Sequence, residues 1–328
     1  MRVAMGVSAF LLAAMALSLG VGLRSIPLAE FWAMMAHYDP TNPAHVTVAQ
    51  IRLPRMLGGL VAGAALGLAG TVMQSVTRNP LADPGIMGVN AGAALGLLLG
   101  SLLLGGIDGG GAVLLTFPGA ALASAAVFAL GGGLRGDTGP IRLTLAGTAL
   151  NALFLSLVTG MVLLSQQSLN TMRFWIAGTL NLAESRPLLE LGLVTLAAGL
   201  LALALAPRLE ALSLGVSLSR GLGAHPGRSQ AGALLVVTLA AGAAVSVAGP
   251  VVFLGLMAPP MARLLVGHRL RAEICVSAAL GAGFLLLADT LGRVIFPPSE
   301  VRVGVMIALL GAPIFIAIAR RMRPGAET

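Results

Sequence analysis

The feature that most constrains this chain is an uncharged run from Met56 to Val76, bounded by arginines on both sides. At 1.5 Å per residue, a helix of about twenty residues crosses the roughly 30 Å of hydrocarbon in a bilayer. Within the run, Gly59, Gly63 and Gly67 recur every four residues, so they share one helix face and let a second helix approach closely. The run therefore predicts a membrane-spanning helix packed inside a bundle.

The rest of the chain repeats this apolar pattern. Its mean hydropathy is +0.95, and only 10% of its residues are charged, against about 25% in soluble domains. This composition excludes an ordinary soluble protein and predicts one all-α domain over residues 1–328, a polytopic membrane bundle of about ten helices. The expected helices cover about residues 4–23, 56–76, 86–107, 113–131, 143–165, 188–206, 230–248, 250–266, 273–291 and 303–319.

The first run and the polar intervals need separate interpretation. Residues 4–23 could form a signal peptide or a first span, and the missing small-residue cleavage site before Arg24 favours the span. Residues 24–55 are expected to form a mixed loop with a short interfacial helix near Leu28 to Met35. The half-polar interval from Gln166 to Pro187 is expected to lie along the membrane surface.

The formal charge of +8 comes from arginine alone, since the sequence contains no lysine. The arginines fall between apolar runs and form no basic patch with aromatic residues, so nucleic acid is not an expected partner. Ten spans put both termini on the same side of the membrane, and more arginines lie on that side than on the other. The positive-inside rule then predicts that both termini are cytoplasmic. Without lysine there is no G-x-x-x-x-G-K-[ST] phosphate loop, so ATP hydrolysis would need another subunit.

Residues suited to catalysis or metal binding are few and scattered. The single Cys275 lies in an apolar run, and His37, His45, His225 and His268 show no ligand spacing. The predicted spans hold no Ser/His/Asp or Cys/His arrangement. We therefore expect no enzyme activity, no metal site and no cofactor in this chain.

An ordered set of motifs carries a family resemblance. RLPR, a glycine-rich helix ending in Gln74 and then RNPLADPGIMGVNAGA are followed by AGPVVFLGLMAPPMARLLVG, LLLADTLGR and GVMIALLGAPIFI. From about Arg52 to Arg321 the chain resembles the FecCD/BtuC-type permeases of bacterial ABC importers for ferric siderophores, haem and cobalamin. Its motifs most resemble those of the ferric catecholate, enterobactin-type members. One departure is Pro259-Pro260, where the family usually has Pro-His.

The resemblance implies a type II importer permease in the bacterial inner membrane. It would work as one of two permease subunits, identical or homologous, above two ATPase subunits that hold ATP and Mg²⁺. A cytoplasmic loop at about residues 207–229 would couple to the ATPase, although an ordinary solvated loop is the alternative. The residues that match the coupling motif are Leu214, Gly215, Ser219, Arg220, Gly221, Leu222 and Gly223.

The resemblance also assigns docking and gating residues. Arg52, Arg55 and Arg293 would receive acidic side chains of a periplasmic or lipid-anchored binding protein, because the guanidinium fork suits carboxylates. Headgroup anchoring is the alternative. The residues that would form the cytoplasmic gate, unless they only cap helices, are Asn79, Leu81, Thr144 and Thr148.

Asp289 is the acid whose position decides between mechanisms. It stands four residues before Arg293, so an ion pair on one helix face is expected. A proton-coupled secondary transporter would instead use this acid as its carrier.

A channel or structural membrane protein is a further alternative. The expected substrate is a ferric siderophore, with haem and cobalamin left open.

Overall fold

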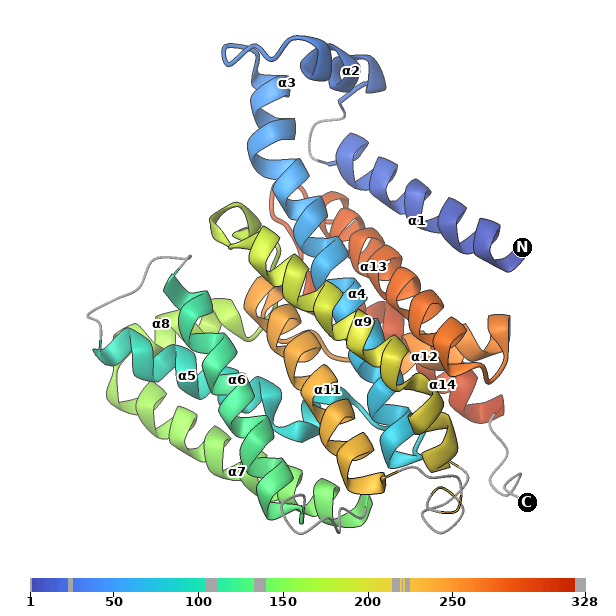
Figure 1. Ribbon diagram of the computed structural model, residues 1–328. Helices are drawn as coiled ribbons and strands as arrows, with labels where there is room; N and C mark the ends of the chain where they lie inside the picture. The colour runs from blue at the N-terminus through green and yellow to red at the C-terminus, as the bar shows by residue number, and fades with distance from the viewer. Residues whose placement is uncertain are drawn as a thin grey trace.

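The computed structural model describes residues 2–22, 26–103, 111–132, 140–213, 219, 221 and 225–321. These residues form helices and connecting segments and contain no β-strand, as expected for an all-α chain. In Figure 1, α4, α9 and α11 occupy the middle, with α5 to α8 on one side and α1 and α13 on the other.

The elements follow the chain in this order: α1 (Arg2–Gly20), α2 (Leu28–Ala36), α3 (Pro43–Val46), the π-helix η1 (Thr47–Arg52), α4 (Leu53–Thr77), the 3-10 helix η2 (Pro84–Met87), α5 (Val89–Leu103), α6 (Gly111–Leu130), α7 (Pro140–Leu164), α8 (Gln166–Trp175), η4 (Ala183–Ser185), α9 (Leu188–Ser213), α11 (Pro226–Ala248), α12 (Leu254–Val266), α13 (Leu270–Val294) and α14 (Val303–Arg321).

Helix α4 is the centre of the bundle and packs against α9, α11, α12 and α13. Its glycine face lies against α13, which runs antiparallel to it. A Cβ atom at Gly63 would lie only 2.5 Å from the Gly281 carbonyl oxygen, and one at Gly67 would collide with the Ser277 carbonyl. The predicted small-residue packing face is thus confirmed, and it brings the two backbones into contact.

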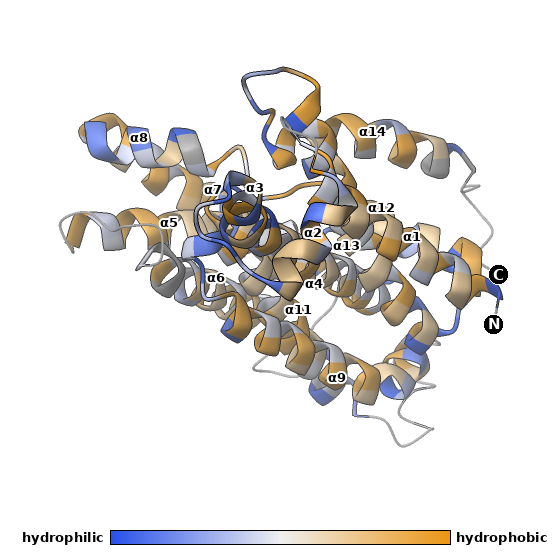
Figure 2. Cartoon of the chain, turned by 90° about the horizontal axis from the view of Figure 1, so that it is seen from above, coloured by the Kyte–Doolittle hydropathy of each residue, from blue (hydrophilic) through white to orange (hydrophobic). Residues whose placement is uncertain are grey.

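In the part of the chain that the structure describes, six helices are long and apolar enough to cross a membrane, and four further apolar helices are shorter. Every predicted span coincides with one of these helices, although the boundaries differ. In Figure 2 hydrophobic residues colour most of the bundle, whereas hydrophilic residues gather on α8 and around α2 and α3. The six long spans are Arg2–Gly20, Pro43–Thr77, Ile141–Leu164, Leu188–Ser213, Pro226–Ala248 and Leu270–Val294.

The start of the central helix corrects the predicted loop. A loop was expected to run to residue 55, but α3, η1 and α4 form one helical stretch that begins at Pro43. The Asn42 side chain accepts a hydrogen bond from the Ala44 N–H and caps this stretch. Pro54 lacks an N–H and lies in the first turn of α4, directly after the π-helical segment Thr47–Arg52. The expected interfacial helix is present as α2.

The end of α9 is a second correction. The coupling loop was expected to begin at residue 207, but α9 continues through Pro207 to Ser213. Leu209 and Leu212 are fully buried in these last two turns. Their burial stabilises the helix past the proline, because tertiary packing outweighs local propensity.

Candidate transport sites

Four charged side chains meet at the N-terminal end of α4 and the C-terminal end of α13. Arg55 Nε donates to both oxygens of Asp289 at 2.9 Å, and its Nη2 lies 2.8 Å from Oδ1. Arg55 Nη1 donates to Glu300 Oε2 at 2.8 Å. Arg293 Nη2 lies 3.0 Å from Asp289 Oδ2, which confirms the predicted ion pair on one helix face. With Arg52 we call these residues the arginine cluster.

Two arginines of this cluster, Arg52 and Arg293, also cap the C-terminal end of α1. Arg52 Nη1 donates to the carbonyl oxygens of Leu19 and Gly20 at 2.6 and 2.9 Å. Arg293 Nη1 donates to the Ser18 carbonyl at 3.0 Å, and its Nη2 donates to the Ser18 hydroxyl. The last carbonyls of a helix lack hydrogen-bond donors within the helix and carry partial negative charge. The two guanidiniums supply these carbonyls with both donors and positive charge.

The three predicted docking arginines therefore lie together but face inward. Arg52, Arg55 and Arg293 are 4%, 5% and 4% exposed, and Asp289 is 1% exposed. A docking role stays a prediction, since a binding protein could reach these guanidiniums only after their internal partners move. Glu300 was not predicted, because nothing in the sequence links it to Arg55, 245 positions away.

A second group of polar side chains lies at the opposite end of the same helices. Arg263 Nε donates to Glu273 Oε1 at 2.7 Å, and its Nη2 donates to Gln74 Oε1 at 2.5 Å. Gln74 Nε2 in turn donates to the Leu256 carbonyl at 3.3 Å. We call Gln74, Arg263 and Glu273 the glutamine cluster. It joins α4, α12 and α13 where α4 ends.

The loop after α4 begins with Arg78 in a left-handed conformation, with φ +50° and ψ +32°. Asn79 Oδ1 accepts from the Leu81 N–H at 2.9 Å, and Asp83 Oδ1 accepts from the Gly85 N–H at 2.7 Å. Burial raises the pKa of Asp83, and the hydrogen bond from Gly85 opposes part of that rise. The loop is thus shaped by hydrogen bonds to its own side chains.

The predicted gate residues lie at the surface of the single chain. Asn79 is exposed and Leu81 is 52% exposed. Thr144 and Thr148 are exposed on α7, where the Thr148 hydroxyl donates to the Leu145 carbonyl at 3.0 Å. Their joint role as a gate stays a prediction.

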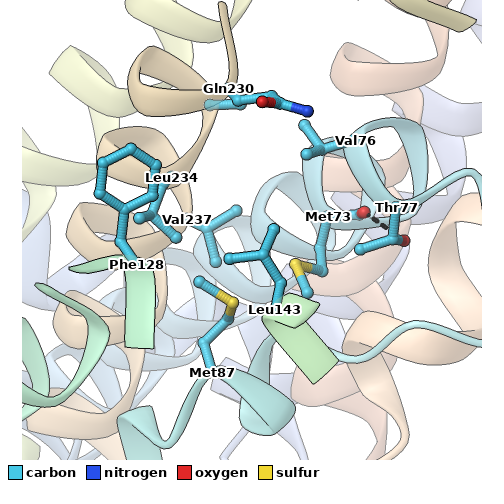
Figure 3. A pocket seen from close by; sticks show the side chains of 10 residues that line it. Met73, Val76, Thr77, Met87, Phe128, Leu143, Gln230, Leu234 and Val237 are labelled. Carbon is cyan, nitrogen blue, oxygen red and sulfur yellow. Dashed lines mark hydrogen bonds between the residues drawn. The ribbon is translucent and has the colours of Figure 1, made fainter. Parts of the chain in front are cut away.

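The elements that carry these two pairs do meet nearby, since η2 packs against α7. A cavity of about 10 Å³, the space of one water molecule, lies beside this contact. Figure 3 shows apolar side chains pointing into it from α4, η2, α6, α7 and α11, with one amide at its rim. They include Met73, Met87, Phe128, Leu143 and Gln230. This apolar lining suits packing contacts that can rearrange.

Most of the predicted coupling motif lies outside the described residues. Only two of its members are described: Ser219 is buried, whereas Gly221 is exposed with open space around it. The members outside the described residues are Leu214, Gly215, Arg220, Leu222 and Gly223. Within the described part of the chain, no group of three or more His, Cys, Asp or Glu side chains could hold a metal ion.

A bundle of membrane-length helices around a buried central helix, with polar clusters at both ends of that helix, defines a multi-span membrane protein. The chain belongs to the FecCD transport family, whose model matches residues 10–321. It is thus a transport permease of the ABC importer type and not an enzyme; the ATPase is a separate subunit. The family resemblance read from the motifs is confirmed.

Several curated relatives match nearly the whole chain. The ferric enterobactin transport system permease protein FepD of Escherichia coli (strain K12) is 42% identical, over 98% of this chain and 95% of the relative. The iron(3+)-hydroxamate import system permease protein FhuB of Bacillus subtilis (strain 168) is 37% identical, over 94% of this chain and 80% of the relative. The Fe(3+) dicitrate transport system permease protein FecC of Escherichia coli is also 37% identical, over 88% and 87%.

Solved structures share the fold. A metal-chelate type ABC transporter in an inward-facing conformation superposes with a TM-score of 0.81 and 27% identity, covering 98% of this chain and 99% of that one. PsaBC from Streptococcus pneumoniae in complex with Fab reaches a TM-score of 0.59 at 17% identity, which bears on the fold alone.

Proposed function

We propose that this chain is the permease subunit of an ATP-driven importer that moves a ferric siderophore across the bacterial inner membrane by alternating access. The observation that carries the substrate class is the 42% identity to a ferric enterobactin permease over 98% of this chain. The hydroxamate and dicitrate permeases among the relatives support an iron chelate more broadly. A catecholate of the enterobactin type is the first substrate to test, and haem or cobalamin is the alternative within the family.

The four shorter apolar helices complete the proposed topology. They are Val89–Leu103, Leu115–Leu130, Leu254–Val266 and Val303–Ala317, and together with the six long spans they give ten crossings. An even number puts both termini on one side, and the arginine distribution supports the cytoplasm as that side. The Arg78 end of α4 then faces the cytoplasm, and the Arg55 end faces the periplasm.

A second permease subunit, identical or homologous, is the proposed partner of α7. Only 11% of the span of α7 is buried within the chain. Leu145 and Leu153 are 63% and 52% exposed, and they line an open groove of about 470 Å³ with Arg142. An exposed apolar face of this size needs lipid or protein against it. Thr144 and Thr148 lie on the same helix, which fits a pathway between two permeases.

The remaining partners are two ATPase subunits and a periplasmic or lipid-anchored binding protein. The ATPase would dock on the segment between α9 and α11, shorter than the predicted 207–229 because α9 extends to Ser213. The binding protein would approach the arginine cluster, where three guanidiniums lie together. Guanidiniums suit an acidic partner, through encounter and orientation more than through affinity.

The proton-coupled alternative is less well supported. A proton carrier must exchange with water, but Asp289 is 1% exposed and contacts Arg55 and Arg293 at 2.8 and 3.0 Å. A channel or purely structural protein would have no ATPase partner.

The experiment that tests the proposal begins with the tagged chain in native membranes. Gentle solubilisation followed by mass spectrometry should recover a Walker-containing ATPase in stoichiometric amount, and any second permease chain. The purified complex in ATP-loaded liposomes should then take up radiolabelled ferric enterobactin with its binding protein. A chain that repeatedly purifies alone, or uptake driven by a pH gradient without ATP, would overturn the proposal.

A further inference from the structure

Arg78 joins two segments that the proposed function assigns to different tasks. It is the first residue after α4 and directly precedes Asn79 and Leu81, the proposed gate residues. Its Nη2 donates to the carbonyl oxygen of Leu212 at 2.5 Å. Leu212 is the next-to-last residue of α9, directly before the proposed ATPase-docking segment. One side chain therefore connects the start of the gate loop to the start of the coupling segment.

The backbone conformation of Arg78 is unusual for an arginine. Its φ of +50° lies in the left-handed region, which at a helix end usually holds glycine or asparagine. In the described part of the chain, Gly88 holds such a left-handed position at the end of η2, with φ +69° and ψ +7°. An arginine at such a position costs about 1 kcal/mol or more in backbone strain. The guanidinium contact gives a physical reason for this residue.

The acceptor end of the contact is fixed by the bundle. Leu209 and Leu212 are fully buried in the last turns of α9. Glu210, in the same turn, accepts a hydrogen bond from the Leu270 N–H at the start of α13, 2.8 Å away. Leu212 O belongs to the last four carbonyls of α9, which lack helical partners, and a cation there is favoured. The end of α9, the start of α13 and Arg78 thus form one connected unit.

The donor end is equally stiff. The Asn79 side chain accepts from the Leu81 N–H, and the Ala82 N–H donates to the Asn79 carbonyl at 3.1 Å. The loop directly after Arg78 is therefore a closed turn and not a slack connection. A displacement of Arg78 moves Leu81 with it.

We propose that Arg78 is a positioning residue that transmits movement of the ATPase-docking segment to the Asn79–Leu81 gate loop. This inference rests on the proposed function of the two segments. When the docked ATPase shifts the end of α9, the hydrogen bond from Arg78 to the Leu212 carbonyl moves the guanidinium with it. The guanidinium in turn displaces the gate loop. Losing the contact leaves both segments in place but separates their motions.

The test uses the full complex in liposomes and compares transport with ATP hydrolysis. Arg78→Asn tolerates the left-handed backbone but removes the guanidinium, whereas Arg78→Lys keeps a cationic donor. Arg208→Asn, at an exposed arginine two turns from the end of α9, is the matched control. Arg78→Asn should lower ferric enterobactin uptake per ATP hydrolysed by roughly 2- to 30-fold, with Arg78→Lys intermediate and Arg208→Asn unchanged.

A second measurement keeps the inference testable if uptake is low. In a Cys275→Ser background, spin labels at Leu81→Cys and Leu145→Cys report the distance from the gate loop to α7. That distance should change on addition of ATP and Mg²⁺ in the otherwise wild-type complex, and the change should be lost in Arg78→Asn. An ATP-dependent change of full size in Arg78→Asn, or an equal loss in Arg208→Asn, would overturn the inference. A wild-type complex that neither hydrolyses ATP nor transports would overturn the proposed function instead.

Discussion

The two ends of α4 and α13 differ in how their charged side chains are held. In the arginine cluster, Arg55 and Asp289 pair with each other inside the bundle, almost fully buried. In the glutamine cluster, the Arg263 side chain remains 21% exposed, and Gln74 and Glu273 share it. Close by, Arg78 lies at the surface. One end is locked by mutual ion pairs, and the other is joined by fewer, more accessible contacts.

This difference indicates at which end of α4 and α13 a movement costs less free energy. Breaking a buried ion pair leaves an unpaired charge in low dielectric, which is strongly unfavourable. Breaking a contact near the surface lets water replace the partner. The Arg55 end is therefore expected to act as a fixed clamp on α1, α4 and α13, whereas the contacts of Arg263 at the other end can rearrange during a transport cycle.

The most severe test of the clamp is Asp289→Ala. The change leaves the Arg55 and Arg293 guanidiniums facing each other without their shared carboxylate. We expect a loss of about 3–5 kcal/mol in the free energy of unfolding. Denaturant titration of the purified chain in mixed micelles measures this loss.

Glu190→Ala, at an exposed acid near the start of α9, serves as the control and should stay within about 0.5 kcal/mol of wild type. A loss below about 1 kcal/mol in Asp289→Ala would mean that the clamp is no stronger than a surface ion pair. The contrast between the two ends would then disappear.

Arg263→Ala probes the other end by the same titration. It leaves Glu273, which is 5% exposed, without its guanidinium, and it frees the Gln74 amide. We expect a loss of about 1–3 kcal/mol, smaller than for Asp289→Ala because water can enter beside the partly exposed arginine. An equal or larger loss would reverse the assignment of fixed and movable ends.

Asp83 offers a finer test within the gate loop. Asp83→Ala removes the acceptor for the Gly85 N–H and should cost about 0.5–2 kcal/mol. Asp83→Asn keeps an oxygen acceptor and removes a carboxylate whose pKa burial raises, so it should equal or exceed wild type at neutral pH.

The sign of the pH effect follows from the same shift. Because the folded chain binds this proton more readily than the unfolded chain, protonation stabilises the fold as pH falls. The advantage of Asp83→Asn over wild type should therefore shrink on acidification, which thermal unfolding at several pH values can follow. An advantage that grows on acidification would contradict the assignment.

Local patterns predicted much of this structure, and long-range contacts account for most of what was missed. Apolar runs predicted the helices, glycine spacing predicted the packing face of α4 without its partner helix, and i,i+4 spacing predicted the Asp289–Arg293 pair. The link from Arg55 to Asp289 joins residues 234 positions apart, which no periodicity reveals. The expected loops ended at residue 55 and began at residue 207, whereas the helices continue across Pro54 and Pro207, next to a π-helical turn and over buried leucines.

Glu300→Gln is the mildest change and bears most directly on docking. The Glu300 side chain is 24% exposed, so losing its ion pair with Arg55 should cost only about 0.2–1 kcal/mol of stability. If Arg55 also receives a carboxylate from the binding protein, Glu300 competes with that carboxylate. Its removal should then tighten binding by up to about fivefold, measured by titrating purified binding protein onto the permease in nanodiscs.

The comparison with Glu184→Gln, at an exposed acid between α8 and α9, separates competition from a general change in charge. Tightening in both variants would indicate long-range electrostatics alone, since each removes one negative charge. Tightening confined to Glu300→Gln places the partner's acid at Arg55 itself. No change in either variant would leave the arginine cluster as a structural clamp, because a guanidinium that never exchanges its partner cannot contribute to docking.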